Sequence, residues 1–270
     1  MSRSRRFLFP LFLLAVALAI ALSARASEPS KELRKTIPLG PDGRVEVETY
    51  KGSVEVAAEE RADVVVEARV IPDRDCGDER AWADWVDRTE VRIDARPNAV
   101  RVTSDYGRLE SYHRGFLGWC TARPFVEYRI RMPGTASLAI KDYKSKIDVV
   151  RLAAPLRLES YKGTMRVHDL SGRLDLETYK GNARVEFARF GGDSRLETYK
   201  GDVELSLPKG TGFTVDAESG RHGRLRSDFE PPSLVVSGRR SGEHLSGSVN
   251  GGGPRLVAST HKGTIQLVAR

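Results

Sequence analysis

The residues of this chain that could do chemistry recur as one short motif, an aromatic ring followed by an ammonium group and a glycine. The motif Tyr-Lys-Gly or a near copy occurs at Tyr50-Lys51-Gly52, Tyr143-Lys144-Ser145, Tyr161-Lys162-Gly163, Tyr179-Lys180-Gly181, Tyr199-Lys200-Gly201 and His261-Lys262-Gly263. The four central copies follow one another at intervals of 18, 18 and 20 residues. Spacing this regular predicts a repeated structural unit.

The side chains of the motif suit the binding of an anionic polymer, because tyrosine is flat and amphipathic and lysine is cationic. The candidate binding residues are the aromatic and basic members of the central copies, Tyr143, Tyr161, Tyr179, Tyr199, Lys144, Lys162, Lys180 and Lys200. The partners they suggest are acidic polysaccharide, lipopolysaccharide or an envelope protein. The alternative is that a polar corner residue was duplicated with the repeat and forms an ordinary solvated face.

A second candidate for chemistry is Tyr112-His113-Arg114, in the stretch "LESYHRG", which echoes the motif without its spacing. A Tyr or His base beside a basic residue is what a polysaccharide lyase requires. The sequence shows no paired carboxylates at a suggestive position, no Ser-His-Asp order, no phosphate loop and no metal-ligand cluster. We therefore expect a non-catalytic protein without a cofactor, with a lyase as the alternative.

Each copy of the motif lies between two alternating runs. Before it, a run such as Leu174-Asp175-Leu176-Glu177-Thr178 places apolar and small residues on one face and charges on the other. After it, a run such as Met165-Arg166-Val167 alternates in the same way and leads to a second glycine-containing corner, Leu170-Ser171-Gly172. One unit is therefore strand, corner, strand, corner in about 18 residues.

A unit of this size cannot fold alone. It buries four or five aliphatic side chains at roughly 1.5–3 kcal/mol each, whereas fixing its backbone costs about 1–2 kcal/mol per residue. Its copies must stack and share a core. The sequence thus predicts an all-β fold, a β-solenoid similar to a parallel β-helix with two-strand rungs of 18 to 20 residues. A sandwich of antiparallel hairpins is the alternative.

Stacking at about 4.8 Å per rung would place identical side chains in columns. Tyr161, Tyr179 and Tyr199 would then stack their rings, while Lys162, Lys180 and Lys200 would repel one another by about 1 kcal/mol per pair in water. The neighbouring acidic column Glu159, Glu177 and Glu197 can relieve that repulsion. We therefore expect that packing tolerates the lysines and does not require them.

The first 26 residues have the pattern of a secretory signal peptide. Arg3, Arg5 and Arg6 precede an apolar run of about 16 residues, shorter than the roughly 20 that a spanning helix needs, and Ala24-Arg25-Ala26 follows. An uncleaved anchor is the alternative. Cleavage removes four arginines and lowers the formal charge from +7 to +3, so the basic composition does not indicate nucleic-acid binding. After cleavage we expect no integral membrane segment.

The mature chain, residues 27–270, is expected to be a single solenoid domain whose insertion, residues 72–125, is tied down by a disulfide between Cys76 and Cys120. In an oxidising compartment such a bridge contributes about 4 kcal/mol; a reactive thiol or a metal site is the alternative. The elements expected here are a rung over residues 45–56, strands over 62–70, 90–94, 100–104 and 126–131, and a helix over 78–88 that packs through Trp82 and Trp85.

The C-terminal part carries a resemblance to a known family. The segments "LPKGTGFTVDAESG" and "VNGGGPRLVASTHKGTIQL", together with the signal peptide and the short rungs, resemble the bacterial putative adhesin family, a secreted domain of unknown function. The resemblance covers about residues 46–267 and is strongest from Leu138 onward. It implies a right-handed, mostly parallel β-solenoid in the cell envelope, and it supplies no catalytic or ligand residues. The chain departs from the family in its Trp-rich, cysteine-containing insertion and in the Tyr-Lys corners.

These observations together predict an exported binding or structural module at the periplasm or surface of a bacterium. An accessory factor in envelope-stress signalling is a further alternative.

Overall fold

The computed structural model describes residues 28–107, 109, 112–113, 119–120, 122–241 and 243–270. The expected signal peptide lies outside the described residues, and so do Arg114 and the side chains of Tyr112, His113 and Cys120.

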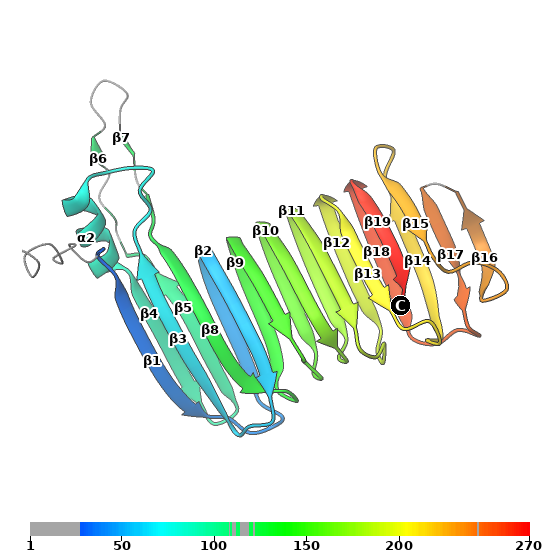
Figure 1. Cartoon of the computed structure of the whole chain (residues 1–270), viewed down its shortest axis with the longest axis horizontal. Helices are drawn as coiled ribbons and strands as arrows, with labels where there is room; N and C mark the ends of the chain where they lie inside the picture. Colours follow the sequence, from blue (N-terminus) through cyan, green and yellow to red (C-terminus); the bar gives the residue numbers. More distant parts are fainter. Residues whose placement is uncertain (1–27, 108, 110–111, 114–118, 121, 242) are drawn as a thin grey trace, which may run out of the picture.

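Seventeen strands form one long sheet that folds over an elongated core (Figure 1). They are β1 (Lys31–Pro38), β2 (Arg44–Glu59), β3 (Asp63–Ile71), β4 (Glu90–Arg96), β5 (Ala99–Asp105), β8 (Phe125–Pro133), β9 (Ser137–Val150), β10 (Leu156–Leu170), β11 (Leu174–Phe187), β12 (Ser194–Lys200), β13 (Val203–Leu207), β14 (Phe213–Ser219), β15 (Arg224–Ser227), β16 (Leu234–Arg240), β17 (His244–Val249), β18 (Arg255–Lys262) and β19 (Thr264–Ala269). A short ribbon of β6 (Tyr112–His113) and β7 (Trp119–Cys120) and one helix, α2 (Glu79–Arg88), complete the described elements.

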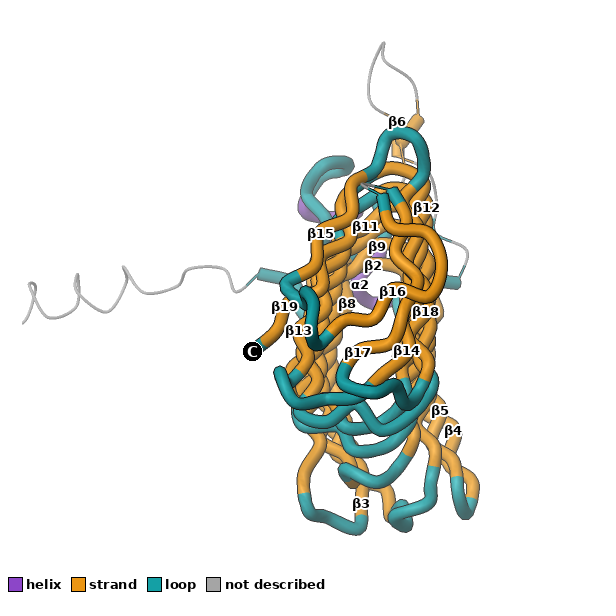
Figure 2. Tube along the Cα trace, turned by 90° about the vertical axis from the view of Figure 1, so that its right-hand side faces the viewer, coloured by secondary structure: helices purple, strands orange, loops and turns teal. Residues whose placement is uncertain are grey.

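The predicted rung is confirmed, with the motif at its middle corner. β11 pairs in parallel with β12 before the corner, over Asp175–Lys180, and with β13 after it, over Ala183–Glu186. Strands β2, β9 and β10 pass through the corner without a break, whereas β12 with β13, β14 with β15 and β18 with β19 are rungs interrupted there. Seen along the axis, successive rungs lie over one another (Figure 2). The chain is a β-solenoid.

The rungs are parallel and in register, but they do not stack entirely in chain order. β2 pairs with β9, β9 with β10, and β10 with β11, so that Leu156 faces Leu174 and Lys162 faces Lys180. The rung β12 and β13 then pairs with the last rung of the chain, β18 and β19. The rung β14 and β15 lies beyond that last rung.

The two ends of the solenoid are antiparallel. At one end β5 and β8 stack in parallel on β2, and β4, β3 and β1 follow as antiparallel neighbours. At the other end β17 and β16 continue from β14 in antiparallel order. The hairpin alternative is therefore wrong for the repeats and describes only the ends. Strands β4 and β5, which lie within residues 72–125, belong to the main sheet.

The core consists of the inward residues of each alternating run. Leu158, Leu176 and Leu196 are at most 1% exposed and face one another across successive rungs, and Leu174, equally buried, faces Leu156. The outward neighbours of these leucines are polar, so the predicted strand phase is confirmed.

The helix α2 forms where it was expected. Asp78 caps its N-terminus by accepting hydrogen bonds from the backbone N–H groups of Arg80 and Ala81. Trp85 is buried, and the indole Nε1 of Trp82 donates to the carbonyl oxygen of Cys76 at 2.7 Å. Cys76 is itself buried, and there is no free cysteine among the described residues. The pairing of Cys76 with Cys120 stays a prediction.

Replacing a core leucine by a charged residue should unfold the array. In Leu176→Asp a carboxylate would lie between two rungs without a partner, and we expect a loss of at least about 3 kcal/mol in the free energy of unfolding. Chemical denaturation measures this loss. The control is Asp175→Asn, which changes the outward neighbour and should stay within about 0.5 kcal/mol of the parent. A Leu176→Asp variant that unfolds like the parent would contradict the assigned core.

The cysteine bridge is tested on native, exported protein. We expect both thiols to be inaccessible to alkylating reagents until a reductant is added, because each sulfur is already bonded. Reduction should then increase hydrogen exchange around α2 before it does so in the repeats, since the repeats keep their own ladder of hydrogen bonds. Free thiols in the unreduced protein would refute the bridge.

Candidate functional site

The motif corners build a continuous column of six aromatic rings, which we call the aromatic ladder: Tyr50, Tyr143, Tyr161, Tyr179, Tyr199 and His261. Successive ring centroids lie 4.6, 4.8, 5.0, 5.0 and 4.9 Å apart, and the planes differ by 18° or less. The expected tyrosine column is thus confirmed. Tyr50 and His261 extend it, although each is 62 or more residues from its neighbour in the chain.

Only the edges of the ladder rings face solvent. Each inner ring is covered on both faces by its neighbours, yet Tyr143, Tyr161, Tyr179 and Tyr199 remain between 40 and 43% exposed. The exposed part of an aromatic ring stacked in this way is its electropositive edge, here with a phenol hydroxyl that can donate a hydrogen bond. The ladder therefore presents donors and positive ring edges, and its inner rings offer no free face for stacking.

The two ends of the ladder differ. At the Tyr50 end, Tyr106 packs edge-on at 6.0 Å and the guanidinium of Arg123 lies 4.1 Å from the centre of the Tyr50 ring. Burial raises the pKa of the Tyr106 hydroxyl above its ordinary value. At the other end, Ser219 is in register with Thr260, so the next rung places Gly220 beside His261 and adds no further ring.

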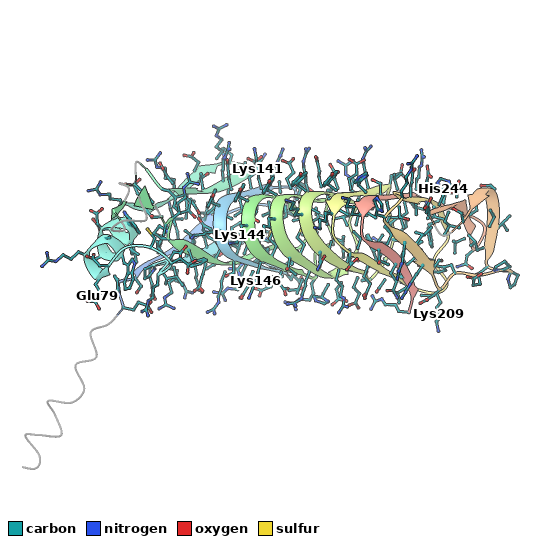
Figure 3. All side chains as sticks on the ribbon, turned by 90° about the horizontal axis from the view of Figure 1, so that it is seen from above. Glu79, Lys141, Lys144, Lys146, Lys209 and His244 are labelled. Atoms are coloured by element: carbon teal, nitrogen blue, oxygen red, sulfur yellow. The ribbon has the colours of Figure 1, made fainter. Side chains whose placement is uncertain are left out.

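Beside the ladder runs a second column, the lysine row, formed by Lys144, Lys162, Lys180, Lys200 and Lys262. The strand register places the last four directly opposite one another in succession, and all five are exposed. Within the described part of the chain, none of the five forms an ion pair. The first four lysines of the row line a shallow groove of about 600 Å³, to which Lys146 adds a further ammonium group, and Lys262 lies beyond its lining. Figure 3 labels Lys144 and Lys146 on this side of the solenoid.

Lys51 occupies the next position of the column but is not part of the exposed row. It is 8% exposed, forms an ion pair with Asp73, and its Nζ atom lies 4.4 Å from the centre of the Phe125 ring. Phe125 also lines the groove. The segment between β3 and β8 therefore neutralises the first lysine and closes this end of the groove.

An interrupted acidic column, the glutamate row, lies on the opposite side of the ladder: Glu48, Glu159, Glu177, Glu197 and Glu218, with Lys141 between the first two and Ser259 between the last two. Its charges are largely directed to arginines, because Glu159 pairs with Arg157 at 2.6 Å and Glu197 pairs with Arg195 of its own strand. Glu48 pairs with Arg101 at 2.9 Å. The expectation that the glutamates relieve the lysines is corrected here: residues two apart share a strand face, so Arg157 and Arg195 reach them first.

Behind the ladder, each corner turns on a small buried polar residue. In most rungs this is Ser or Thr, whereas β9 has Asp142, which accepts hydrogen bonds from the backbone N–H of Ser145 at 2.7 Å and from the hydroxyl of Ser160 at 3.1 Å. Burial raises the pKa of this carboxyl, and the hydrogen bonds from Ser145 and Ser160 oppose that rise. Asp142 thus holds the one corner of the central copies where serine replaces glycine.

The remaining expectations concern other kinds of site. The structure places Tyr112 and His113 on the ribbon β6–β7, and the side chains of this lyase candidate lie outside the described residues. No group of three or more His, Cys, Asp or Glu residues able to hold a metal ion occurs among the described residues. In the same part of the chain, no helix has the length and apolar character needed to cross a bilayer.

Sequence reasoning found the lysines and tyrosines but missed the residues that close the ladder and the groove. Tyr106, Arg123, Asp73 and Phe125 lie outside the repeats and reach the first corner only through the fold. No spacing in the sequence identifies them. The Arg157-x-Glu159 and Arg195-x-Glu197 pairs, in contrast, could have been read from their separation of two residues.

Removing charge from the row should not destabilise the fold. In the triple variant Lys162→Gln, Lys180→Gln and Lys200→Gln, at most about 1 kcal/mol of repulsion per neighbouring pair disappears, and no described ion pair is lost. We expect thermal unfolding at the same temperature as the parent or slightly above it, as measured by calorimetry. A clear decrease would mean that the lysines are held in pairs that stabilise the solenoid.

Comparisons with known proteins identify a family and solved structures that this chain resembles. Residues 134–267 match the family model described as Toastrack DUF4097. A putative cell adhesion protein from Clostridium sporogenes is 12% identical, with a TM-score of 0.47 over 89% of this chain and 100% of the other. A putative adhesin from Bacteroides fragilis is 10% identical, with a TM-score of 0.41 over 89% and 99%. The comparison with curated proteins gave no match. Over residues 134–267, which hold the central repeats and the C-terminal rungs, the chain therefore resembles the Toastrack DUF4097 family.

Proposed function

We propose that this chain is an exported, non-catalytic module of the bacterial cell envelope that binds an acidic envelope polymer through the lysine row. Export by the signal peptide of residues 1–26, the single mature domain and the Cys76–Cys120 bridge are parts of the same proposal. Acidic polysaccharide and lipopolysaccharide are the polymers that we consider first.

The observation that carries the proposal is the absence of local neutralisation along the row. Five ammonium groups lie in register on successive rungs, and within the described residues no carboxylate pairs with them. A protein surface usually disperses charges of one sign among charges of the other. In the nearest acidic column, Glu159 and Glu197 are paired with arginines instead. An aligned, unpaired row of this kind attracts a partner of opposite charge.

The ladder supports the same reading. Its ring edges and hydroxyls are donors that lie next to the lysine row in the chain, one residue before each lysine, although they do not line the groove itself. Because the rings are held by their neighbours, binding would order few flexible side chains apart from the lysines themselves. The site is rigid, open and elongated, which suits a polymer better than a small substrate.

The proposal is tested with purified mature protein and immobilised polygalacturonate, a polyanion without a membrane. We expect binding that weakens as salt is added, because exposed charges are screened. The triple variant at Lys162, Lys180 and Lys200 should bind about 100-fold more weakly, since each lysine contributes about fivefold. Analysis of the polymer after incubation should show no new unsaturated ends.

The matched control removes the same three charges elsewhere on the surface. Lys31, Lys35 and Lys209 are exposed and lie away from the motif corner, so their glutamine variants should bind nearly as the parent does. Equal losses in the two triple variants would show that only net charge matters and would refute the row as the site. Unsaturated ends in the product would support the lyase alternative.

A further inference from the structure

We infer, on the basis of the proposed function, that the ligand is a linear polysaccharide with an anionic group on successive sugars, bound lengthwise along the lysine row. The inference concerns the class of polymer and its direction on the molecule, and three features of the corner carry it. These are the one-dimensional shape of the basic strip, the acidic row beside it and the covered faces of the rings.

The basic strip is long and only about one side chain wide. Its five lysines come from five successive rungs, one from each, and adjacent rungs lie about 4.8 Å apart. Lys146 widens the strip only beside Lys144. A chain that crossed the strip would meet one lysine, whereas a chain that followed it would meet all five.

The acidic side chains beside the ladder disfavour a flat anionic surface, because Glu177 forms no ion pair among the described residues. Glu159 and Glu177 lie on the same corner as Lys162 and Lys180, on the other side of the tyrosines. A bilayer of anionic lipids laid on this corner would face both rows together, and membrane attraction requires a cluster of basic charges. A single polymer chain in the groove, in contrast, faces the lysines and uncharged residues such as Thr164 and Asn182, because no carboxylate lines the groove.

The aromatic ladder argues against a nucleic acid. Proteins that hold single strands without sequence preference stack the bases on free aromatic faces. The faces of Tyr143, Tyr161, Tyr179 and Tyr199 are covered by neighbouring rings at 4.6 to 5.0 Å. What remains exposed are edges and hydroxyls, which can hydrogen-bond to the hydroxyl and carboxylate oxygens of a sugar chain.

The groove also has a direction. Phe125 lines it at the Lys144 end, and there the Lys51–Asp73 ion pair removes the next positive charge. The Lys262 end has no such neutralised lysine, because the following rung has Gly220 beside His261. A bound chain therefore starts or bends away near Phe125 and continues past Lys262.

The experiment is a length series of oligogalacturonates measured by calorimetry with the full mature chain. Affinity should rise by about fivefold for each added sugar that reaches another lysine, and the rise should level off once the oligomer spans all five. In Lys200→Gln the rise should break off earlier than in the parent, because the continuous row is then interrupted. Affinity that is independent of length would overturn the lengthwise arrangement.

Two competing ligands complete the test. Single-stranded DNA and vesicles containing phosphatidylglycerol should bind at least about tenfold more weakly than an oligogalacturonate of similar charge. The double variant Glu159→Gln and Glu177→Gln should strengthen vesicle binding more than oligosaccharide binding, because it removes the acidic row that a bilayer would face. Equal or tighter binding of DNA or vesicles in the parent would overturn the ligand class.

Failure of the inference can be told apart from failure of the proposed function. If polygalacturonate binds and the binding depends on the lysine row, but short and long oligomers bind alike, only the inference falls. If no polyanion binds to the parent at low salt, the proposed function falls and the inference falls with it.

Discussion

The close approach of backbones at the motif corner is the constraint on which the remainder of the structure depends. A Cβ atom at Gly201 would lie 1.9 Å from the carbonyl oxygen of Gly181, and one at Gly263 would lie 2.0 Å from that of Gly201. Both glycines also have positive φ, at 154° and 138°. Each corner therefore fits directly onto the one before it. A slip of one residue would turn every side chain to the opposite face, so this fit fixes the register of both strands of the rung.

Once register is fixed, identical residues must form columns, and the columns have opposite effects on stability. Each stacked ring pair contributes about 0.5–1.5 kcal/mol, and each pair of adjacent lysines costs at most about 1 kcal/mol in water. The ladder thus offsets the lysine row approximately, rung by rung. Glu159 and Glu197, which were expected to neutralise the lysines, are paired with Arg157 and Arg195 instead. Stability alone gives no reason to keep a lysine at each corner, and this supports the proposal that the row binds a ligand.

Much of this architecture was predictable from the sequence, because the pattern of each repeat specifies the buried face and the length of the rung. The alternation around Leu174 and Leu176 specified which face is buried, and the interval between copies specified the rung. The order in which the rungs stack was not predictable, since parallel rungs with the same corner can pair in any order. No local sequence pattern specifies that β18 pairs with β12, or that β5 pairs with β2. For the same reason the columns were foreseen, whereas their closure by Asp73, Phe125, Tyr106 and Arg123 was not.

The exchange of rung order near the C-terminus has a direct consequence for the candidate site. Had the rungs stacked in chain order, β14 would lie against β12, and its corner, Ser219-Gly220, has neither an aromatic ring nor a lysine. The ladder would then end at Tyr199 and the row at Lys200. Because β18 and β19 lie between the two instead, His261 stacks on Tyr199 at 4.9 Å and Lys262 continues the row. The rungs beyond carry no motif and lead into antiparallel strands. The topology therefore gathers every copy of the motif into one uninterrupted corner and leaves the strands without it to form the ends.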